Sequence, residues 1–282
     1  MRRLRDMITP DKPVFAVSAL LILVFLYSTL IEPYNISVTE SRFDIFPGSP
    51  APLKAVLISD TQTAYDYPEY FRRAIAEANA QNPDFVLIAG DIVDGEPRGY
   101  LKLGELKNLK SRYGVFAVLG NHDYGDWNCA NPANYEYADN VTETLESMGI
   151  VVLRNQNSVL EAGGQKLAIA GIDDLWACRS EPQKALANLS QNMPKIILLH
   201  QQEAIYGLSP GVNTVAFAGH THCGQFYFPF ITDYLTEYLG FGKARQGRTT
   251  LPGGTAAYVT CGLTPGGIRL FARPEISVIY LD

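Results

Sequence analysis

The chain has 282 residues, 47% of them hydrophobic and only 18% charged, so disorder over most of its length is excluded. Its length suffices for one large globular domain with a sizeable core. The formal net charge is -6, and no basic run follows the first dozen residues, which excludes non-specific nucleic-acid binding.

The N-terminus carries an uncharged run, VFAVSALLILVFLYSTLI, at positions 14–31. A run of about 18 residues is just long enough for a membrane-spanning helix, so we expect a short basic segment at 1–12 and a transmembrane anchor at 13–31. Basic residues predominate before the run and acidic residues after it. This asymmetry predicts a single-pass protein of the inner membrane, with a cytoplasmic N-terminus and the following domain on the outer, periplasmic face.

A cleaved signal peptide is the alternative interpretation of this run. The sequence YSTLIEP is a poor small-x-small cleavage site, and the run is long for the core of a signal peptide. We therefore expect the helix to be retained as an anchor.

The next residues, 32–52, include five prolines or glycines and are expected to form a linker to a single folded domain at 53–282. Within that domain, short apolar runs rich in β-branched residues predict strands at 53–59, 84–90, 114–120, 166–172, 195–200, 214–220, 256–262 and 275–281. Helical periodicity predicts helices at 69–80, 101–109, 135–148 and 182–189. Several strands are apolar at almost every position, and helices alternate with the early strands. We therefore expect an α/β fold with sheets sandwiched between helices.

Polar side chains follow five of the predicted strands at the point where each ends. They include every histidine of the chain, and the set comprises Asp60, Asp91, Asn121, His122, Asp123, His200, His220 and His222. Ligands of layered α/β proteins gather at the carboxyl ends of strands, and carboxylates beside a core are costly unless they are paired. One such histidine is more simply interpreted as a packed, hydrogen-bonded residue, but four of four at strand ends predict a shared cation site.

The types of ligand indicate which cation. Carboxylate, imidazole and amide oxygen together suit divalent Mn, Fe or Zn, with Mg as a further option, better than Ca or a thiolate-bound zinc. These groups are too many for one tetrahedral ion. The sequence therefore predicts two divalent metal ions, about 3.5–4 Å apart, that share a bridging carboxylate.

Five blocks of the sequence resemble, in their order, the calcineurin-like metallophosphoesterases: Asp60, GDIVD at 90–94, GNHD at 120–123, His200 and GHTH at 219–222. GIDD at 171–174 and GHTHCGQ at 219–225 are most similar to the bacterial membrane-anchored branch of that family. The resemblance covers roughly residues 53–282. It implies a four-layer α/β/β/α sandwich with a dinuclear metal centre, and hydrolysis of a phosphoester or phosphoanhydride by a hydroxide that bridges the metals.

Position by position, the resemblance implies two sets of ligands. One ion would be held by Asp60, Gln62, Asp91 and His222, and the other by Asp91, Asn121, His200 and His220. Asp91 would then bridge the two ions. His122 would stand beside the metals and protonate the leaving group or stabilise charge on the phosphate, and Asp123 would orient His122 or support a neighbouring ligand.

Position 62 departs from the family pattern, because most members carry Asp-x-His where this chain has Asp60-Thr61-Gln62. The amide oxygen of glutamine is a weaker ligand than imidazole for Zn or Fe, so we expect weaker binding of the first ion and a preference for Mn or Mg. The alternative is that Gln62 hydrogen-bonds a metal-bound water.

The other ligand positions are intact, so we expect an active phosphodiesterase or pyrophosphatase that works as a monomer. A metallophosphoesterase scaffold that binds a partner with little catalysis is the alternative. A metallo-β-lactamase-like hydrolase is excluded because its His-x-His-x-Asp-His run is absent.

The substrate is less determined. The segment FYFPFITDYLTEYLGFG at 226–242 is most simply part of the core, and the alternative is an aromatic surface near the bilayer that suits an acyl chain or lipid headgroup. Relatives of this branch are associated with hydrolysis of the UDP-2,3-diacylglucosamine pyrophosphate in lipid A synthesis. That substrate faces the cytosol, whereas the charge asymmetry places the domain outside, so the two expectations conflict.

The four cysteines follow no zinc-binding spacing. In an exported domain, Cys129 with Cys178 or Cys223 with Cys261 could form disulfides. Four buried thiols are an equally good interpretation.

Overall fold

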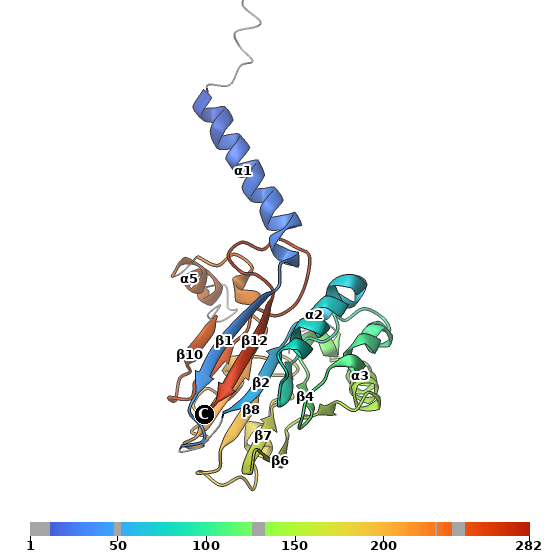
Figure 1. Cartoon of the computed structure of the whole chain (residues 1–282), viewed down its shortest axis with the longest axis vertical. Helices are drawn as coiled ribbons and strands as arrows, with labels where there is room; N and C mark the ends of the chain where they lie inside the picture. The colour runs from blue at the N-terminus through green and yellow to red at the C-terminus, as the bar shows by residue number, and fades with distance from the viewer. Residues whose placement is uncertain (1–11, 48–51, 126–132, 229, 239–245) are drawn as a thin grey trace, which may run out of the picture.

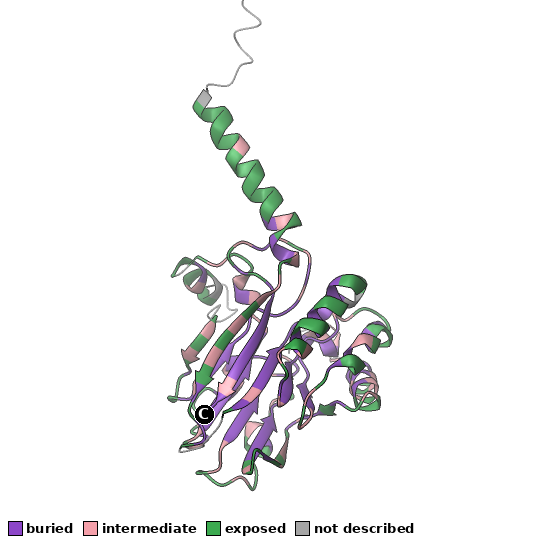
Figure 2. Ribbon diagram, in the orientation of Figure 1, coloured by how far each residue is buried: buried purple, intermediate pink, exposed green. Residues whose placement is uncertain are grey.

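The computed structural model describes residues 12–47, 52–125, 133–228, 230–238 and 246–282. Helix α1 (Lys12–Leu30) projects from one end of the folded body, and most of its side chains are exposed (Figures 1 and 2). The span Pro13–Tyr34 is long and apolar enough to cross a membrane, with a mean hydropathy of 2.6. The helix lies where the apolar run of the sequence predicts it.

Two six-stranded sheets form the body. The strand order of the first sheet is β1 (Ser37–Phe43), β12 (Glu275–Leu281), β2 (Leu53–Ile58), β3 (Phe85–Ala89), β4 (Val115–Val118) and β5 (Val151–Val152). The order of the second is β10 (Gly247–Thr250), β11 (Ala256–Val259), β9 (Thr214–Ala218), β8 (Lys195–Leu198), β7 (Gln165–Gly171) and β6 (Gln156–Ala162). All eight predicted strands are present.

The four strands that the sequence pattern missed, β1, β5, β6 and β10, are the edge strands of the two sheets. Exposed or half-buried residues alternate with more buried ones along them, whereas the central strands are buried at almost every position. An edge strand covers less apolar surface, so its sequence carries a weaker apolar signal.

Strand β1 corrects the interpretation of residues 32–52 as a linker. It runs parallel to β12, in register from Ser37 opposite Glu275 to Phe43 opposite Leu281. Phe43, Ile45 and Phe46 are buried in the core between the sheets. The polar residues of this edge strand resemble linker composition, but the folded domain already includes residues before position 53.

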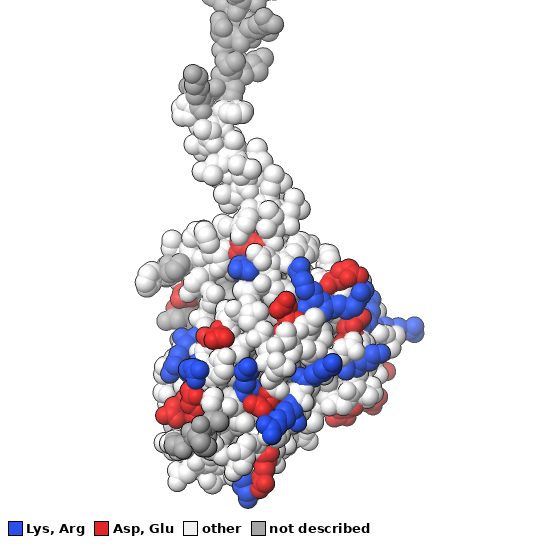
Figure 3. All heavy atoms as spheres, viewed as in Figure 1, with Lys and Arg blue, Asp and Glu red and all other residues white. Residues whose placement is uncertain are grey.

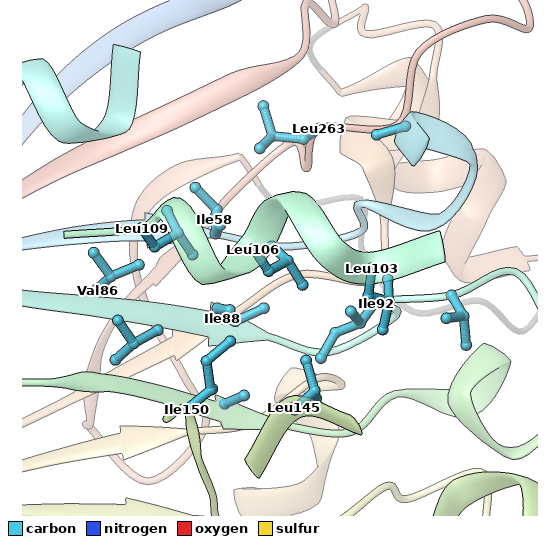
Figure 4. Close-up of a cluster of buried hydrophobic side chains, with 14 of the residues drawn as sticks. Ile58, Val86, Ile88, Ile92, Leu103, Leu106, Leu109, Leu145, Ile150 and Leu263 are labelled. Carbon is cyan, nitrogen blue, oxygen red and sulfur yellow. The ribbon is translucent and has the colours of Figure 1, made fainter. Parts of the chain in front are cut away.

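Helices cover the outer faces of both sheets. The helices α2 (Pro68–Ala80), η3 (Gly99–Asn108, a 3₁₀ helix) and α3 (Tyr135–Ser147) pack on the first sheet, and Figure 4 shows Leu103 and Leu106 of η3 packed with Ile58, Ile88 and Ile92. The short helices α4 (Pro182–Ala185) and η5 (Gln202–Ile205) pack on the second sheet. The inner faces of the two sheets enclose a core that includes Leu57, Leu87, Ile196 and Phe217. This arrangement confirms the predicted four-layer α/β/β/α sandwich.

The predicted site residues follow the carboxyl ends of strands, and these ends lie at the end of the body that carries α1. The chain ends after β12, at the opposite end of the body (Figure 1). Strand β2 is antiparallel to β12, and β3 and β4 are parallel to β2. The carboxyl ends of β2, β3 and β4 therefore lie toward α1.

Candidate metal centre

The polar side chains that follow five strands converge on one buried site. The Nε2 atom of His200 lies 3.1 Å from Oδ2 of Asp91 and 3.2 Å from Nδ1 of His220. The Nε2 atom of His222 lies 3.5 Å from Oδ1 of Asp60. These residues follow β2, β3, β8 and β9, so both sheets contribute to the site.

The ligand atoms fall into two overlapping groups. Asp91, His200 and His220 form one group and Asp60, Asp91 and His222 the other, with the ligand atoms of each group within 4.8 Å of one another. Asp91 is common to both, and the two histidines of the GHTH sequence belong to different groups. This is the pattern that two neighbouring cations with one shared carboxylate require.

The backbone at the strand ends is unusual. Asp60, Asp91, His220 and His222 all have positive φ values between 46° and 71°, a conformation that is uncommon for residues other than glycine. The neighbouring Gly120 is required for close approach, because a Cβ atom there would collide with the side chain of Asp91. Strained backbone of this kind concentrates at functional sites.

The orientation of His200 fits a cation. Its Nδ1 lies 2.7 Å from the carbonyl oxygen of Ala89, so Nδ1 carries the proton in the neutral ring and Nε2 presents a lone pair to the carboxylate of Asp91. A lone pair facing a carboxylate is repulsive unless a positive charge lies between them. In the metal-free site a proton on Nε2 supplies that charge, and a metal ion bound there would take its place.

Burial and mutual charge shift the titration of these groups. Burial raises the pKa of Asp60 to about 6, and burial together with the charge of His200 lowers the pKa of His220 to about 3. Burial opposes the charged form of His200, but the carboxylate of Asp91 outweighs it and raises the pKa of His200 to about 10. His200 in turn holds the pKa of Asp91 well below its usual range, against the effect of burial. The charges of this desolvated site depend on one another, as expected where a cation binds.

Gln62 does not present its amide oxygen to the carboxylates. Its Nε2 donates a 3.0 Å hydrogen bond to Oδ2 of Asp91, and its Oε1 accepts one of 3.1 Å from the hydroxyl of Thr264. Of the two polar atoms of this amide only Oε1 can bind a metal, and in the structure it faces Thr264.

Asn121 and His122 lie at the edge of the site. Oδ1 of Asn121 is 3.4 Å from Nε2 of Gln201, and the backbone N–H of His122 donates to Oδ1 of Asp91 at 2.9 Å. The imidazole Nε2 of His122 is 3.9 Å from Oδ2 of Asp91, and 26% of the side chain is exposed. His122 is therefore beside the metal-ligand groups and open to solvent.

Asp123 connects two loops of the site. Its Oδ1 accepts hydrogen bonds from the N–H groups of Ile92 and Val93, and its Oδ2 accepts one from Gly120, each of 2.9 Å. Burial, and then the charge of Asp91, raise its pKa to about 7. These bonds fix the loop after Asp91 to the loop that carries Asn121.

Several residues of the site received no role from the sequence. Asp174, of the GIDD sequence, is buried and accepts a hydrogen bond from Gln201. The ring of Trp176 packs edge-to-face on His220, with 4.4 Å between the ring centres. The GIDD sequence and the position of Gln201 directly after His200 were the available signals for this outer layer.

Cys223, beside the GHTH sequence, forms a disulfide with Cys261, which follows β11. This pairing confirms one of the two candidate disulfides and overturns the interpretation of these two residues as thiols. Cys178 is also disulfide-bonded, and Cys129, its expected partner, lies outside the described residues. The Cys223–Cys261 bond fixes the loop of His220 and His222 to the end of the neighbouring strand.

Comparisons with known proteins agree with this geometry. The family model "Calcineurin-like phosphoesterase" matches residues 53–224. The uncharacterized metallophosphoesterase YkuE of Bacillus subtilis is 30% identical over 90% of this chain and 88% of its own length. The phosphodiesterase YaeI of Escherichia coli is 27% identical over 91% of this chain and 92% of its own length.

A eukaryotic relative is longer. The putative metallophosphoesterase F40B5.2 of Caenorhabditis elegans is 33% identical over 91% of this chain, and the match covers 54% of the nematode protein. The chain thus spans about half the length of this relative.

Proposed function

Since the chain belongs to the calcineurin-like phosphoesterase family, we propose that it is a phosphodiesterase with two divalent metal ions, anchored in a membrane by α1. The observation that carries the proposal is the position of Asp91, which belongs to both groups of candidate ligands. A carboxylate has two oxygens and can serve two ions at once.

We propose that one ion is held by Asp60, Asp91 and His222, with Gln62 as a weak fourth ligand. The second is held by Asp91, Asn121, His200 and His220. Mn, Fe, Zn and Mg are compatible with this mixture of carboxylate, imidazole and amide groups. When bound, the ions supply positive charge that activates a water molecule and neutralises the phosphoryl oxygens.

His122 is the proposed general acid. Its Nδ1 lies 3.4 Å from the carbonyl oxygen of Asp94, so a proton on Nδ1 points into the protein and Nε2 faces the side of Asp91. Protonated at Nε2, the ring can donate to the oxygen of the leaving group. Its partial exposure leaves room for a substrate beside it.

Asp123 and Asp174 position these groups rather than react. Asp123 holds the backbone of two strand-end loops. Asp174 accepts a hydrogen bond from Gln201, whose amide also reaches Asn121, so it orients one candidate ligand through another side chain.

The proposed substrates are phosphodiesters, including those linked to lipids. The relative YaeI of Escherichia coli is named a phosphodiesterase, which supports a phosphodiester. The disulfide Cys223–Cys261 supports a domain in an oxidising compartment, and thus the outer face of the membrane. It weighs against the nucleotide-linked lipid that faces the cytosol.

The proposal can be tested on the full chain in lipid nanodiscs, loaded in turn with Mn, Mg, Fe and Zn. We expect hydrolysis of bis(4-nitrophenyl) phosphate, with a lower rate for 4-nitrophenyl phosphate and for inorganic pyrophosphate. Asp91→Asn should abolish this hydrolysis, whereas Asp94→Asn, three residues later in the same sequence block, should retain it. A wild-type chain that binds metal but hydrolyses none of these compounds would instead favour a binding scaffold.

A further inference from the structure

An exposed apolar surface lies at the α1 end of the body. Helix α5 (Ile231–Tyr238) carries apolar residues with the spacing i, i+3, i+4 and i+7, a stripe that normally packs on a core. Here the stripe is exposed, and with two neighbours it forms an apolar patch of Phe230, Ile231, Tyr234, Leu235, Tyr238 and Phe271, exposed between 48% and 86%. The core interpretation of this segment is therefore wrong for the apolar residues of α5, whereas Tyr227 packs against the buried cluster of Cys223, Cys261 and Ala272.

Hydrogen bonds on the opposite side of α5 hold the helix with its apolar stripe facing outward. Among the residues of α5 whose burial the structure describes, Thr232 is the buried one. Its hydroxyl accepts a hydrogen bond of 2.8 Å from the N–H of Phe228 and donates one of 2.6 Å to the carbonyl of Phe226. The polar side of the helix is thus the side attached to the body. An apolar patch held outward in this way marks an interaction surface.

The patch is joined to the base of α1. The backbone N–H of Arg269 donates to the carbonyl of Ser28 at 2.8 Å, and the N–H of Ala272 donates to Oε1 of Glu32 at 2.8 Å. Phe271 lies between these two contacts, and its ring packs edge-to-face on Phe228, with 5.6 Å between ring centres. Figure 1 shows α5 at the same end of the body as the base of α1.

From this continuity we infer that the apolar patch is a second membrane contact, which rests in the surface of the bilayer that α1 crosses. The inference rests on the proposed anchor. Ser28 and Glu32, near the C-terminal end of the span Pro13–Tyr34, are hydrogen-bonded to the segment that carries Phe271, so the patch lies at the depth where this span leaves the membrane. Aromatic and leucine side chains on one face of a short helix are suited to the boundary between headgroups and acyl chains.

The composition of the patch indicates which lipids it should bind. It contains no lysine or arginine, and the polar side of α5 carries Asp233 and Glu237. On the face shown in Figure 3, most charged side chains lie over α2 and the lower body, although an acidic and a basic side chain also lie at the base of α1. Binding by the patch should therefore depend on buried apolar area, and neutral phosphatidylcholine should suffice without anionic lipid.

The segment that carries Phe271 is also linked to the metal centre through Arg269. Arg269 is 2% exposed, and its guanidinium donates to the carbonyls of Cys261 and Ala272 and lies 3.4 Å from Nδ1 of His222. One buried residue thus touches the base of α1, the patch segment and the GHTH loop. The inferred contact places the metal centre close to the membrane surface.

Spin labels on the full chain in phosphatidylcholine nanodiscs test this inference. The described cysteines, Cys178, Cys223 and Cys261, are disulfide-bonded, so an introduced cysteine can be labelled selectively. The patch labels are Phe230→Cys and Tyr238→Cys. The controls are Leu20→Cys, in α1, and Val212→Cys, which is 62% exposed just before β9 and thus at the end of the body away from α1.

The experiment measures how often each spin label collides with oxygen, which concentrates in lipid, and with a nickel complex, which stays in water. We expect labels at Phe230 and Tyr238 to favour oxygen, as the label at Leu20 does, and the label at Val212 to favour nickel. Adding Tyr234→Asp and Leu235→Asp to the Tyr238 label should shift it toward nickel, whereas Leu101→Asp, an exposed leucine of η3, should not.

Two results would overturn the inference. Patch labels that favour nickel as strongly as Val212 would show a surface in water. Patch labels shielded from both reagents, with spin–spin broadening, would show a second copy on the patch. A label at Leu20 that favours nickel would contradict the anchor instead. Because no step measures hydrolysis, the outcome is independent of the proposed activity.

Discussion

The amide nitrogen of Gln62 donates a 3.0 Å hydrogen bond to Oδ2 of Asp91, the carboxylate that both groups of candidate ligands share. The amide oxygen of Gln62 is held by Thr264 at 3.1 Å. At the position where the family resemblance leads one to expect a histidine, this chain thus has a side chain that hydrogen-bonds the shared carboxylate. The first metal would consequently be held by fewer strong ligands than the second.

Replacing Gln62 by histidine should strengthen binding of the first ion. Imidazole is a better ligand than an amide oxygen for Zn or Fe, and we expect the metal affinity to rise about tenfold. Titration of the full chain with a competing chelator, with metal content read by elemental analysis, measures the change. An unchanged or lower affinity of Gln62→His would mean that the hydrogen bond to Asp91 is the important function of this residue.

Removal of the shared carboxylate should empty both sites. We expect Asp91→Ala to retain neither ion, because each candidate group loses a ligand. The matched control Asp94→Asn should retain both, since Asp94 lies outside the groups that contain Asp91. If elemental analysis finds two ions per chain in Asp91→Ala, the assignment of a bridging ligand is wrong.

Loss of His122 should affect catalysis rather than metal content. We expect His122→Ala to lower kcat about 10²-fold or more for a phosphodiester with an alkyl leaving group, because general acids contribute at this scale. The defect should be smaller for a 4-nitrophenyl ester, whose leaving group departs without a proton. An equal loss with both substrates would contradict the role of a general acid.

Asp123 should contribute strongly to stability. Asp123→Ala leaves three buried N–H groups, of Ile92, Val93 and Gly120, without their acceptor, and we expect the free energy of unfolding to fall by about 3–5 kcal/mol. Asp123→Asn keeps one acceptor oxygen and should lose less. Thermal unfolding of the metal-free chain compares the two variants, and equal midpoints for both and the wild type would refute this role.

Breaking the disulfide should loosen the GHTH loop. Cys223 and Cys261 are separated by 38 residues, for which loop-closure entropy predicts a loss of about 4 kcal/mol on replacing both by serine. We also expect faster release of metal to a chelator, because His220 and His222 are in the fixed loop. Release at the wild-type rate would show that the loop is held by its other contacts alone.

Much of the fold could be predicted because its signals are local. The eight central strands are apolar along their whole length, and the helices α2 and α3 have clear periodicity, so both types of element were found. The edge strands were missed because β1 and β6 are half exposed, and their alternation is weak. The contact between β1 and β12 joins opposite ends of the chain, which no local pattern reports.

The same distinction between local and long-range signals applies to the candidate site. Asp60, Asp91, Asn121 and the four histidines were identified because each follows an apolar run, and the ends of parallel strands meet at one edge. The partners of these residues depended on packing between segments far apart in the sequence. Three contacts depend on such packing: that of Thr264 with Gln62, that of Gln201 with Asn121 and that of Arg269 with His222.

The sequence by itself thus determined the class of fold, the positions of the central strands along the chain and the residues available to bind metal, because these follow from hydrophobic periodicity and from residue types at strand ends. The tertiary structure decided which atoms meet. It grouped Asp91 with both sets of ligands, joined Cys223 to Cys261 and turned the stripe of α5 away from the core. Such relations arise from long-range packing and hydrogen bonding, where two segments are adjacent only after the chain has folded.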